Sequence, residues 1–182
     1  MIDNILIQEI SNTYIKNRGI TAAVLRLDLL HPVVSGNKIY KLKYYIEKAL
    51  YQEKEEIVSF GGAHSNHLAA TAFMAKENGL KSIGYVRGER PPLFSDTLLD
   101  CEHYGMELKF TERKKFDALQ IDCEESNKPG SLIIPYGGYG RIGALGAKEI
   151  LSFKEAGNYN LIMASAGSGT MGAGLILSLQ KH

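Results

Sequence analysis

The chain of 182 residues is 45% hydrophobic and 23% charged, which is typical of a globular protein with material for one large domain or two small ones. Its formal net charge is +1 and no run of Lys and Arg exceeds three residues, so a nucleic-acid-binding protein is not indicated. No window approaches the ~20 apolar residues of a membrane-spanning helix, and the first residues lack the basic segment of a secretion signal. We therefore expect a cytoplasmic protein whose partner is a small molecule. Cys101 and Cys123 belong to no C-x-x-C pair and are expected to be free thiols.

In chain order, short apolar runs alternate with amphipathic patterns from about residue 21 onwards. The expected strands are 21–30, 57–60, 82–86, 107–110, 131–134 and 161–164. The expected helices are 38–52, 68–78, 95–104 and 142–154, with a last helix after the glycines at 167–174. This alternation predicts an α/β fold with an open, mainly parallel sheet between helices, a three-layer sandwich. Residues 111–130 are polar and end in Asn127-Lys128-Pro129-Gly130, which predicts a linker or domain crossing.

Two lysines stand at the start of the first helical pattern, in the stretch Ser35-Gly36-Asn37-Lys38-Ile39-Tyr40-Lys41-Leu42. Lys38 and Lys41 are three residues apart, so their side chains are expected to lie near one face of the helix. Gly36 lets the backbone turn into the helix, and Ser35 or Asn37 is expected to cap it. The positive end of the helix dipole disfavours a protonated amine and favours an anion. One lysine could then act as a nucleophile and the other hold a phosphate, although a solvated basic face fits the same residues.

The glycine-rich segment 165–174 joins an expected strand to an expected helix. Gly167, Gly169 and Gly172 satisfy G-x-G-x-x-G, the fingerprint of a dinucleotide site. That site also needs an acidic residue about 20 positions further on, and only ten residues follow Gly172. The segment is therefore interpreted as a phosphate cradle, with hydroxyl donors from Ser168 and Thr170, or as an ordinary tight turn.

Polar residues follow the expected strand 57–60 in the segment Gly61-Gly62-Ala63-His64-Ser65-Asn66-His67. The carboxyl ends of parallel strands form the edge at which open α/β sheets bind ligands. The hydrolase motif G-x-S-x-G is absent, and His64 and His67 lack a third metal ligand nearby, so neither a serine hydrolase nor a zinc site is expected. Either histidine also fits a capping or loop position.

Taken together, these motifs resemble one known family, from about residue 22 to the end of the chain. They occur in order and at suitable spacing as Ser35-Gly36-Asn37-Lys38 with Lys41-Leu42, as Phe60-Gly61-Gly62-Ala63-His64-Ser65-Asn66-His67 with Ala70-Thr71-Ala72, as Pro135 with Gly137-Gly138, and as the loop 167–174. The chain resembles the pyridoxal-phosphate enzymes of the 1-aminocyclopropane-1-carboxylate deaminase and D-cysteine desulfhydrase family. That resemblance implies the two-domain tryptophan synthase β-like fold. Residues 1–44 and 131–182 would belong to the large cofactor-binding domain, and residues 45–130 would form the small α/β domain.

The resemblance also implies a role for each matching residue. Lys38 matches the lysine that forms the Schiff base with pyridoxal 5'-phosphate, and Lys41 matches a phosphate-contacting lysine. Asn66 corresponds to the residue that bonds the 3-hydroxyl oxygen of the cofactor. Ser65, as a catalytic serine, would share the substrate side with Asn66 and His67. The phosphate cradle would be Gly167, Ser168, Gly169, Thr170 and Met171.

The activity implied is deamination of a small amino acid, either β-elimination from D-cysteine to pyruvate, sulfide and ammonia, or deamination of 1-aminocyclopropane-1-carboxylate. His67 after Ser65-Asn66 favours the desulfhydrase. Relatives of this kind continue well beyond the phosphate loop, so the sequence is expected to be a truncated member with an incomplete large domain, and a homodimer only if the fold is complete. The alternatives are a catalytically impaired fragment and a binding module for the cofactor or phosphate without turnover.

Overall fold

The computed structural model describes residues 5–32, 34–125, 128–152 and 154–179. Its strands are β1 (Ile7–Ile10), β2 (Ala22–Leu25), β3 (Glu56–Gly61), β4 (Lys81–Arg87), β5 (Met106–Thr111) and β6 (Ser131–Ile134). Its α-helices are α1 (Thr13–Asn17), α2 (Lys38–Tyr51), α3 (Asn66–Glu77), α4 (Asp96–His103), α5 (Arg113–Glu125), α6 (Arg141–Ala147) and α7 (Thr170–Leu179). Short 3-10 turns are η1 (Leu27–Leu29), η2 (Tyr136–Gly138), η3 (Lys148–Leu151) and η4 (Lys154–Asn158).

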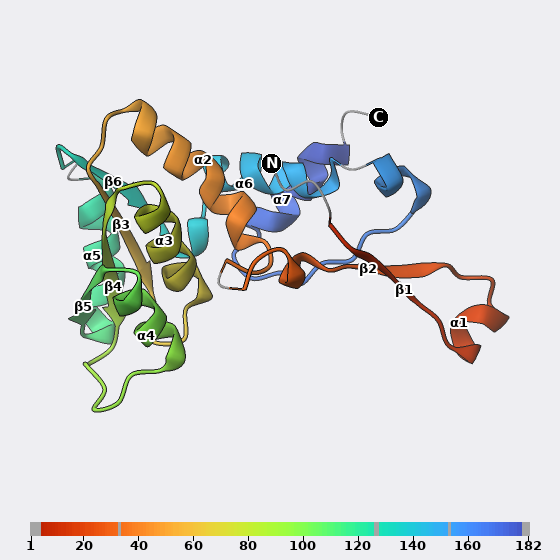
Figure 1. The fold of residues 1–182 in the computed structure, drawn as a ribbon, viewed down its shortest axis with the longest axis horizontal. Coiled ribbons are helices and arrows are strands. Elements are labelled where there is room, and N and C mark those ends of the chain that lie inside the picture. Colours follow the sequence, from red (N-terminus) through yellow and green to blue (C-terminus); the bar gives the residue numbers. More distant parts are fainter. Residues whose placement is uncertain (1–4, 33, 126–127, 153, 180–182) are drawn as a thin grey trace.

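The expected parallel sheet is confirmed. Four strands pair in the order β5-β4-β3-β6, and every pairing between them is parallel. Helices α3 and α4 lie on one face of this sheet and α5 lies on the other, which makes the three-layer arrangement of Figure 1. β6 pairs with β3 in the same sheet, while the predicted division of the chain at residues 45 and 131 stays a prediction.

Alternation along β3 assigns its side chains to the two helical layers, because successive residues of a strand point to opposite faces. Val58 and Phe60 pack with Phe116 of α5. Ile57 packs in the other layer, in a cluster that includes Leu42 of α2. Ser59 alternates in the same direction as Ile57 and is fully buried, so β3 presents a hydroxyl to the layer that contains α2 and α3.

Helices α2, α6 and α7 pack through very close backbone contacts. A Cβ on Gly146 of α6 would lie 1.9 Å from the carbonyl oxygen of Tyr40 in α2. A Cβ on Gly174 of α7 would lie 2.5 Å from the Cβ of Ala147 in α6. Only glycine allows approaches this close. The start of α2 and the start of α7 are therefore connected through α6.

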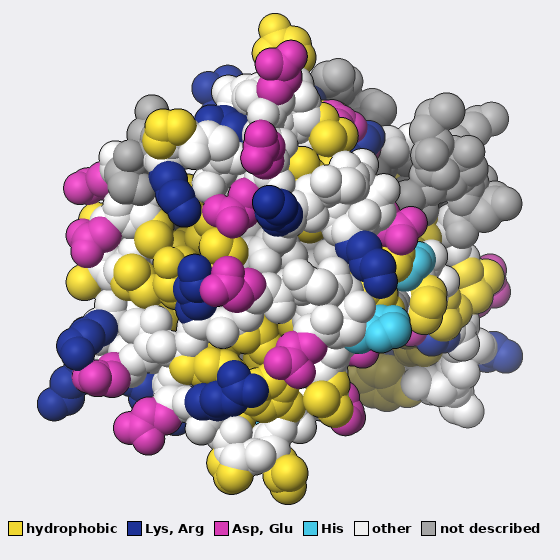
Figure 2. Space-filling view, turned by 60° about the vertical axis from the view of Figure 1, so that its left-hand side comes forward, with side chains coloured by type: hydrophobic (Ala, Val, Ile, Leu, Met, Phe, Trp, Pro, Cys, Tyr) yellow, Lys and Arg dark blue, Asp and Glu magenta, His cyan; other side chains and the backbone are white. Residues whose placement is uncertain are grey.

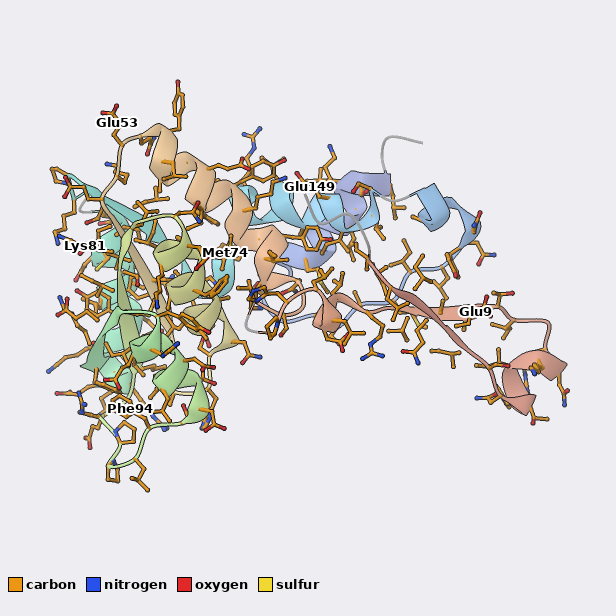
Figure 3. The ribbon with its side chains drawn as sticks, viewed as in Figure 1. Glu9, Glu53, Met74, Lys81, Phe94 and Glu149 are labelled. Atoms are coloured by element: carbon orange, nitrogen blue, oxygen red, sulfur yellow. The ribbon has the colours of Figure 1, made fainter. Side chains whose placement is uncertain are left out.

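Glu149 adds a polar contact between α2 and the turn that follows α6 (Figure 3). Its Oε2 accepts a hydrogen bond from Lys43 Nζ at 2.8 Å, and its Oε1 accepts one from the hydroxyl of Tyr44. Lys43 and Glu149 are partly exposed, so we expect this ion pair to add little to stability. Its main effect is to fix the orientation of α2 relative to the turn after α6.

β1 and β2 form a separate antiparallel pair, with α1 at its far end (Figure 1). On the face shown in Figure 2, acidic and basic side chains are interspersed with hydrophobic ones, without a field of one sign. None of the described helices combines the length and apolar character that a membrane crossing requires.

Several local expectations were wrong. The expected linker at 111–130 contains α5, because its polar residues form the outer side of a helix whose Phe116 is buried against Phe60; Asn127 lies outside the described residues. The expected strand 161–164 is irregular, since no described strand pairs with it, and Leu161 and Met163 are exposed. The expected strand 21–30 shortens to β2 followed by η1, and the expected helix 142–154 is α6 continued by η3.

We predict that Gly146→Ala lowers the free energy of unfolding by about 2–3 kcal/mol, since the new methyl group would overlap Tyr40 and move α6 away from α2. Alanine is the better helix former by about 1 kcal/mol, so a net loss identifies the contact. Urea unfolding followed by circular dichroism measures the change. Gly157→Ala, where no heavy atom lies within 4 Å of the added Cβ, is the matched control. Equal stability of Gly146→Ala and wild type would mean that moving α6 costs no more than the about 1 kcal/mol that alanine gains in the helix, and would contradict the prediction.

Candidate functional site

The start of α2, the turn η2 and the segment before α7 enclose a cavity of about 210 Å³. The described residues that line it come from these elements and from the first turn of α7. They are Asn37, Lys38, Lys41, Tyr136, Gly137, Ser165, Ala166, Gly167, Ser168, Gly169, Met171 and Gly172. The two lysines and the glycine-rich loop, which the sequence predicted to act together, therefore meet at one cavity.

Lys41 reaches the glycine-rich loop across 127 positions of sequence: its Nζ donates to Ser168 Oγ at 3.5 Å. Ser168 Oγ in turn lies 3.0 Å from Thr170 Oγ1, the hydroxyl of the first residue of α7. Lys41 is only 3% exposed and Thr170 only 4%, so the amine and this hydroxyl are held by the surrounding packing. An ammonium, two hydroxyls and the free backbone N–H groups of a helix start are the donors that bind a phosphate.

Lys38 is the first residue of α2, and its Nζ donates to Asn37 Oδ1 at 3.1 Å. The amide nitrogen of Asn37 lies 3.1 Å from Met171 Sδ, so Asn37 connects Lys38 to α7. Asn37 occupies the N-cap position of α2, but its side chain makes no capping hydrogen bond. The expectation that Asn37 caps the helix through its side chain is therefore wrong, because that side chain is used at the cavity.

Both lysines are poorer bases than free lysine. Burial lowers the pKa of Lys38. Burial, and then the nearby charge of Lys38, lower the pKa of Lys41 from its ordinary value of 10.5 to about 8. A lowered pKa makes an unprotonated amine available as a nucleophile near neutral pH. The same crowding of positive charge creates a place where an anion is favourable.

His67 lies in the interior beside this cavity, on the first turn of α3, and is 3% exposed. Its Nε2 is 2.9 Å from Ser59 Oγ, and the Ser59 hydroxyl donates to the carbonyl oxygen of Ile134 at 3.0 Å. Burial, followed by the charges of Lys38 and Lys41, lowers the pKa of His67 from 6.5 to about 3. The imidazole is therefore neutral at physiological pH.

Ser65 and Asn66 are not among the described residues that line the cavity. Ser65 is the N-cap of α3, and its Oγ accepts a hydrogen bond from the backbone N–H of Leu68 at 3.4 Å. Asn66 begins α3 and its side chain is exposed. The catalytic and substrate roles predicted for Ser65, Asn66 and His67 stay predictions.

Sequence reasoning assigned no site role to two contributors to this region. Asn37 lines the cavity, and Ser59 contacts His67. The signal for Ser59 was a lone hydroxyl inside the apolar run of β3, because buried polar groups in strands are normally hydrogen-bonded. Nothing in the local pattern distinguished Asn37 from a helix cap.

No family model matches the chain. Its curated relatives include a protein of Thermotoga maritima named as a putative 1-aminocyclopropane-1-carboxylate deaminase, 32% identical over 167 residues, which cover 86% of this chain and 53% of the relative. A D-cysteine desulfhydrase of Yersinia pestis is 25% identical over 179 residues, which cover 87% of this chain and 52% of the relative. The chain thus spans about half the length of the curated relatives it matches.

A solved structure described as a homologue of 1-aminocyclopropane-1-carboxylate deaminase superimposes with a TM-score of 0.77 and 29% sequence identity. The match covers 97% of this chain and 56% of that one. The predicted fold class is confirmed by this similarity together with the parallel sheet and its helical layers.

We predict that Lys41→Met stabilises the anion-free chain by about 1–3 kcal/mol at pH 7, because an apolar side chain of similar length replaces a buried charge. The unfolded lysine keeps its proton up to about 10.5 and the folded one up to about 8, so the gain should shrink as pH rises from 8 to 10.5. Urea unfolding over this range measures it. Lys48→Met, an exposed position on the same helix, is the control, and a Lys41→Met chain less stable than wild type at pH 7 would contradict the burial argument.

We also predict that stability falls as the solution is acidified from pH 6.5 towards pH 3. In this range an unfolded His67 takes up a proton that the folded one, with its pKa of about 3, does not. The slope is at most about 1.4 kcal/mol per pH unit. His67→Gln should flatten this part of the unfolding profile, whereas His64→Gln, at an exposed site, should leave it unchanged. Identical profiles for wild type and His67→Gln would show that His67 is not held neutral.

Proposed function

The chain is a homologue of the 1-aminocyclopropane-1-carboxylate deaminase and D-cysteine desulfhydrase family over most of its own length, and on that premise we propose that it carries the phosphate- and amine-bearing part of a pyridoxal-phosphate site. The observation that carries this proposal is the contact between Lys41 Nζ and Ser168 Oγ beside Lys38. This contact brings the glycine-rich loop, proposed to bind the phosphate, into the same cavity as the amine of Lys38.

The residues of the cavity fit the chemical groups of this cofactor. Its phosphate needs donors and positive charge, which Lys41, Ser168, Thr170 and the start of α7 supply. Its aldehyde needs an amine that is unprotonated part of the time, and burial lowers the pKa of Lys38 in that direction. When bound, the cofactor supplies the electron sink for breaking bonds at the α-carbon of an amino acid.

In this proposal the two lysines have different tasks. Lys41 remains an ammonium while its ligand is bound, because a phosphate close to it favours the charged form. Lys38 is the Schiff-base lysine, and Asn37 orients it through the hydrogen bond to its Nζ. Met171, whose sulfur contacts Asn37, would keep that amide in place.

The substrate is proposed to be a small amino acid that loses ammonia, either D-cysteine, which also loses sulfide, or 1-aminocyclopropane-1-carboxylate. Ser65, Asn66 and His67 are proposed for the substrate side, with Asn66 also near the cofactor ring. Their support is the position of Ser65 and Asn66 between the carboxyl end of β3 and the start of α3, the edge at which open α/β sheets bind ligands. A cytoplasmic location and a homodimer of the complete fold belong to the same proposal.

A second candidate is a module that binds the cofactor or a phosphate without turnover. The observation that favours it is the composition of the cavity, whose lining contains the amines and the phosphate loop but neither Ser65 nor Asn66. Under this alternative the cofactor still reacts with Lys38, but amino acids are not deaminated.

Reductive trapping tests the proposal directly. The chain is mixed with pyridoxal phosphate, reduced with borohydride and digested, and the labelled lysine is identified by mass spectrometry. We expect the label on Lys38, its loss in Lys38→Ala, and a much weaker label in Lys41→Met at low cofactor concentration because the phosphate is no longer held.

Lys48→Arg, on the exposed side of the same helix, should be labelled like wild type. The proposal would be refuted if the labelled lysine lay outside the cavity, or if Lys38→Ala were labelled as strongly as wild type. Production of pyruvate or 2-oxobutyrate from D-cysteine or 1-aminocyclopropane-1-carboxylate then separates the enzyme from the binding module.

A further inference from the structure

His67 has one buried polar atom for which its proposed place on the substrate side names no partner. Its Nδ1 is inaccessible to solvent and, among the described residues, has no hydrogen-bond partner. Native proteins pair the large majority of their buried polar side-chain atoms, and an unpaired one is costly. We therefore expect that a donor reaches this nitrogen in another arrangement of the site.

Ser59 determines which nitrogen of His67 carries the proton. The hydroxyl of Ser59 has a single hydrogen, and it is donated to the carbonyl oxygen of Ile134, which can only accept. Ser59 Oγ then faces His67 Nε2 with a lone pair at 2.9 Å, so Nε2 must be the protonated nitrogen. In the neutral ring Nδ1 is left bare, as an acceptor.

Lys41 is a donor close to this acceptor with hydrogens to spare. Its ammonium has three N–H groups, and its hydrogen bond to Ser168 Oγ, at 3.5 Å, is longer than the usual range. A Cβ placed on Gly138 would lie 3.6 Å from Lys41 Cε and 3.6 Å from His67 Cε1. The lysine stem and Cε1 of the imidazole, the carbon between its two nitrogens, thus border the same small space above Gly138.

We propose that Ser59 is a positioning residue for Lys41: it holds His67 as the Nε2–H tautomer, so that the bare Nδ1 offers the Lys41 ammonium a second acceptor besides Ser168. Rotation of the end of the lysine side chain moves Nζ between the two acceptors. In one position Nζ bonds to Ser168 of the phosphate loop. In the other it bonds to His67 Nδ1, so that the ammonium and this nitrogen both have a partner when no anion is bound. Only the purpose of this arrangement, keeping Lys41 charged and ready for an anion, rests on the proposed function.

The groups around Lys41 agree with a neutral acceptor at this place. Lys38 on the same helix is positive, and Tyr136 of η2 also lines the cavity. Glu149 on η3 is bonded to Lys43 and Tyr44, and so is not the counter-charge for Lys41. A protonated His67 would add a third positive charge, whereas a bare nitrogen favours the ammonium.

Nuclear magnetic resonance of the free 182-residue chain tests this inference without any cofactor. The imidazole nitrogen shifts report the tautomer of His67, and the Cε shift of Lys41 followed against pH reports its titration midpoint. We expect the Nε2–H tautomer in wild type between pH 5 and 9. In Ser59→Ala and His67→Leu we expect the Lys41 midpoint to fall by about one pH unit, because the acceptor is misoriented or removed.

Two variants separate positioning from general loss of structure. His67→Gln places an amide N–H towards Ser59 and an amide oxygen towards Lys41, so it should keep the midpoint close to that of wild type. Ser131→Ala removes another buried hydroxyl of the same sheet, one that donates to Glu56, and should not move the midpoint. If Ser59→Ala does not fold, the wild-type tautomer and the contrast between His67→Gln and His67→Leu still decide.

The inference is overturned by an Nδ1–H tautomer in wild type, by an unchanged Lys41 midpoint in His67→Leu, or by equal shifts in Ser59→Ala and Ser131→Ala. Trapping experiments that fail to label Lys38 would instead refute the proposed function and leave these readouts standing.

Discussion

The close approach of three helices is the constraint on which the site depends. Gly146 allows α6 to lie against the carbonyl of Tyr40 in α2, and Gly174 allows α7 to lie against Ala147 in α6. A side chain at either glycine would separate helices whose starts carry the reacting groups. The contact between Lys41 and Ser168 is a consequence of this packing, since α6 contacts both the helix that carries Lys41 and the helix that follows Ser168.

The buried lysines of the cavity lower folding stability and make the amines more reactive. Burial lowers the pKa of both lysines, so the folded chain holds amines that would be more stable in water when charged. Sites of this kind are common where a side chain must act as a nucleophile or hold an anion. His67 is kept neutral in the same way, by burial and by the charges of Lys38 and Lys41, while its Nε2 lies against Ser59, whose hydroxyl donates to Ile134 of β6.

Local patterns predicted much of the scaffold. The helix from Lys38, the helix after Asn66 and the parallel strands were recognisable from apolar periodicity and from glycines at their ends. The failures have one cause in common. The composition of α5 predicts a linker because its polar outer side dominates it, and the apolar run 161–164 predicts a strand although it has no pairing partner among the described residues. In both cases the deciding interaction lies in a neighbouring element.

By itself, the sequence determined which residue types stand at the turns of this fold: two lysines at a helix start, a glycine-rich loop before the last helix, and the Ser65-Asn66-His67 segment after a buried strand. These features depend only on the spacing of residues along the chain, and the sequence contains that spacing in full. The tertiary structure alone decided that Lys41 meets Ser168, that Asn37 contacts Met171, and that Ser59 pairs with the ring of His67. Each of these depends on atoms brought within about 3.5 Å by packing, and hydrogen bonds form only at such distances.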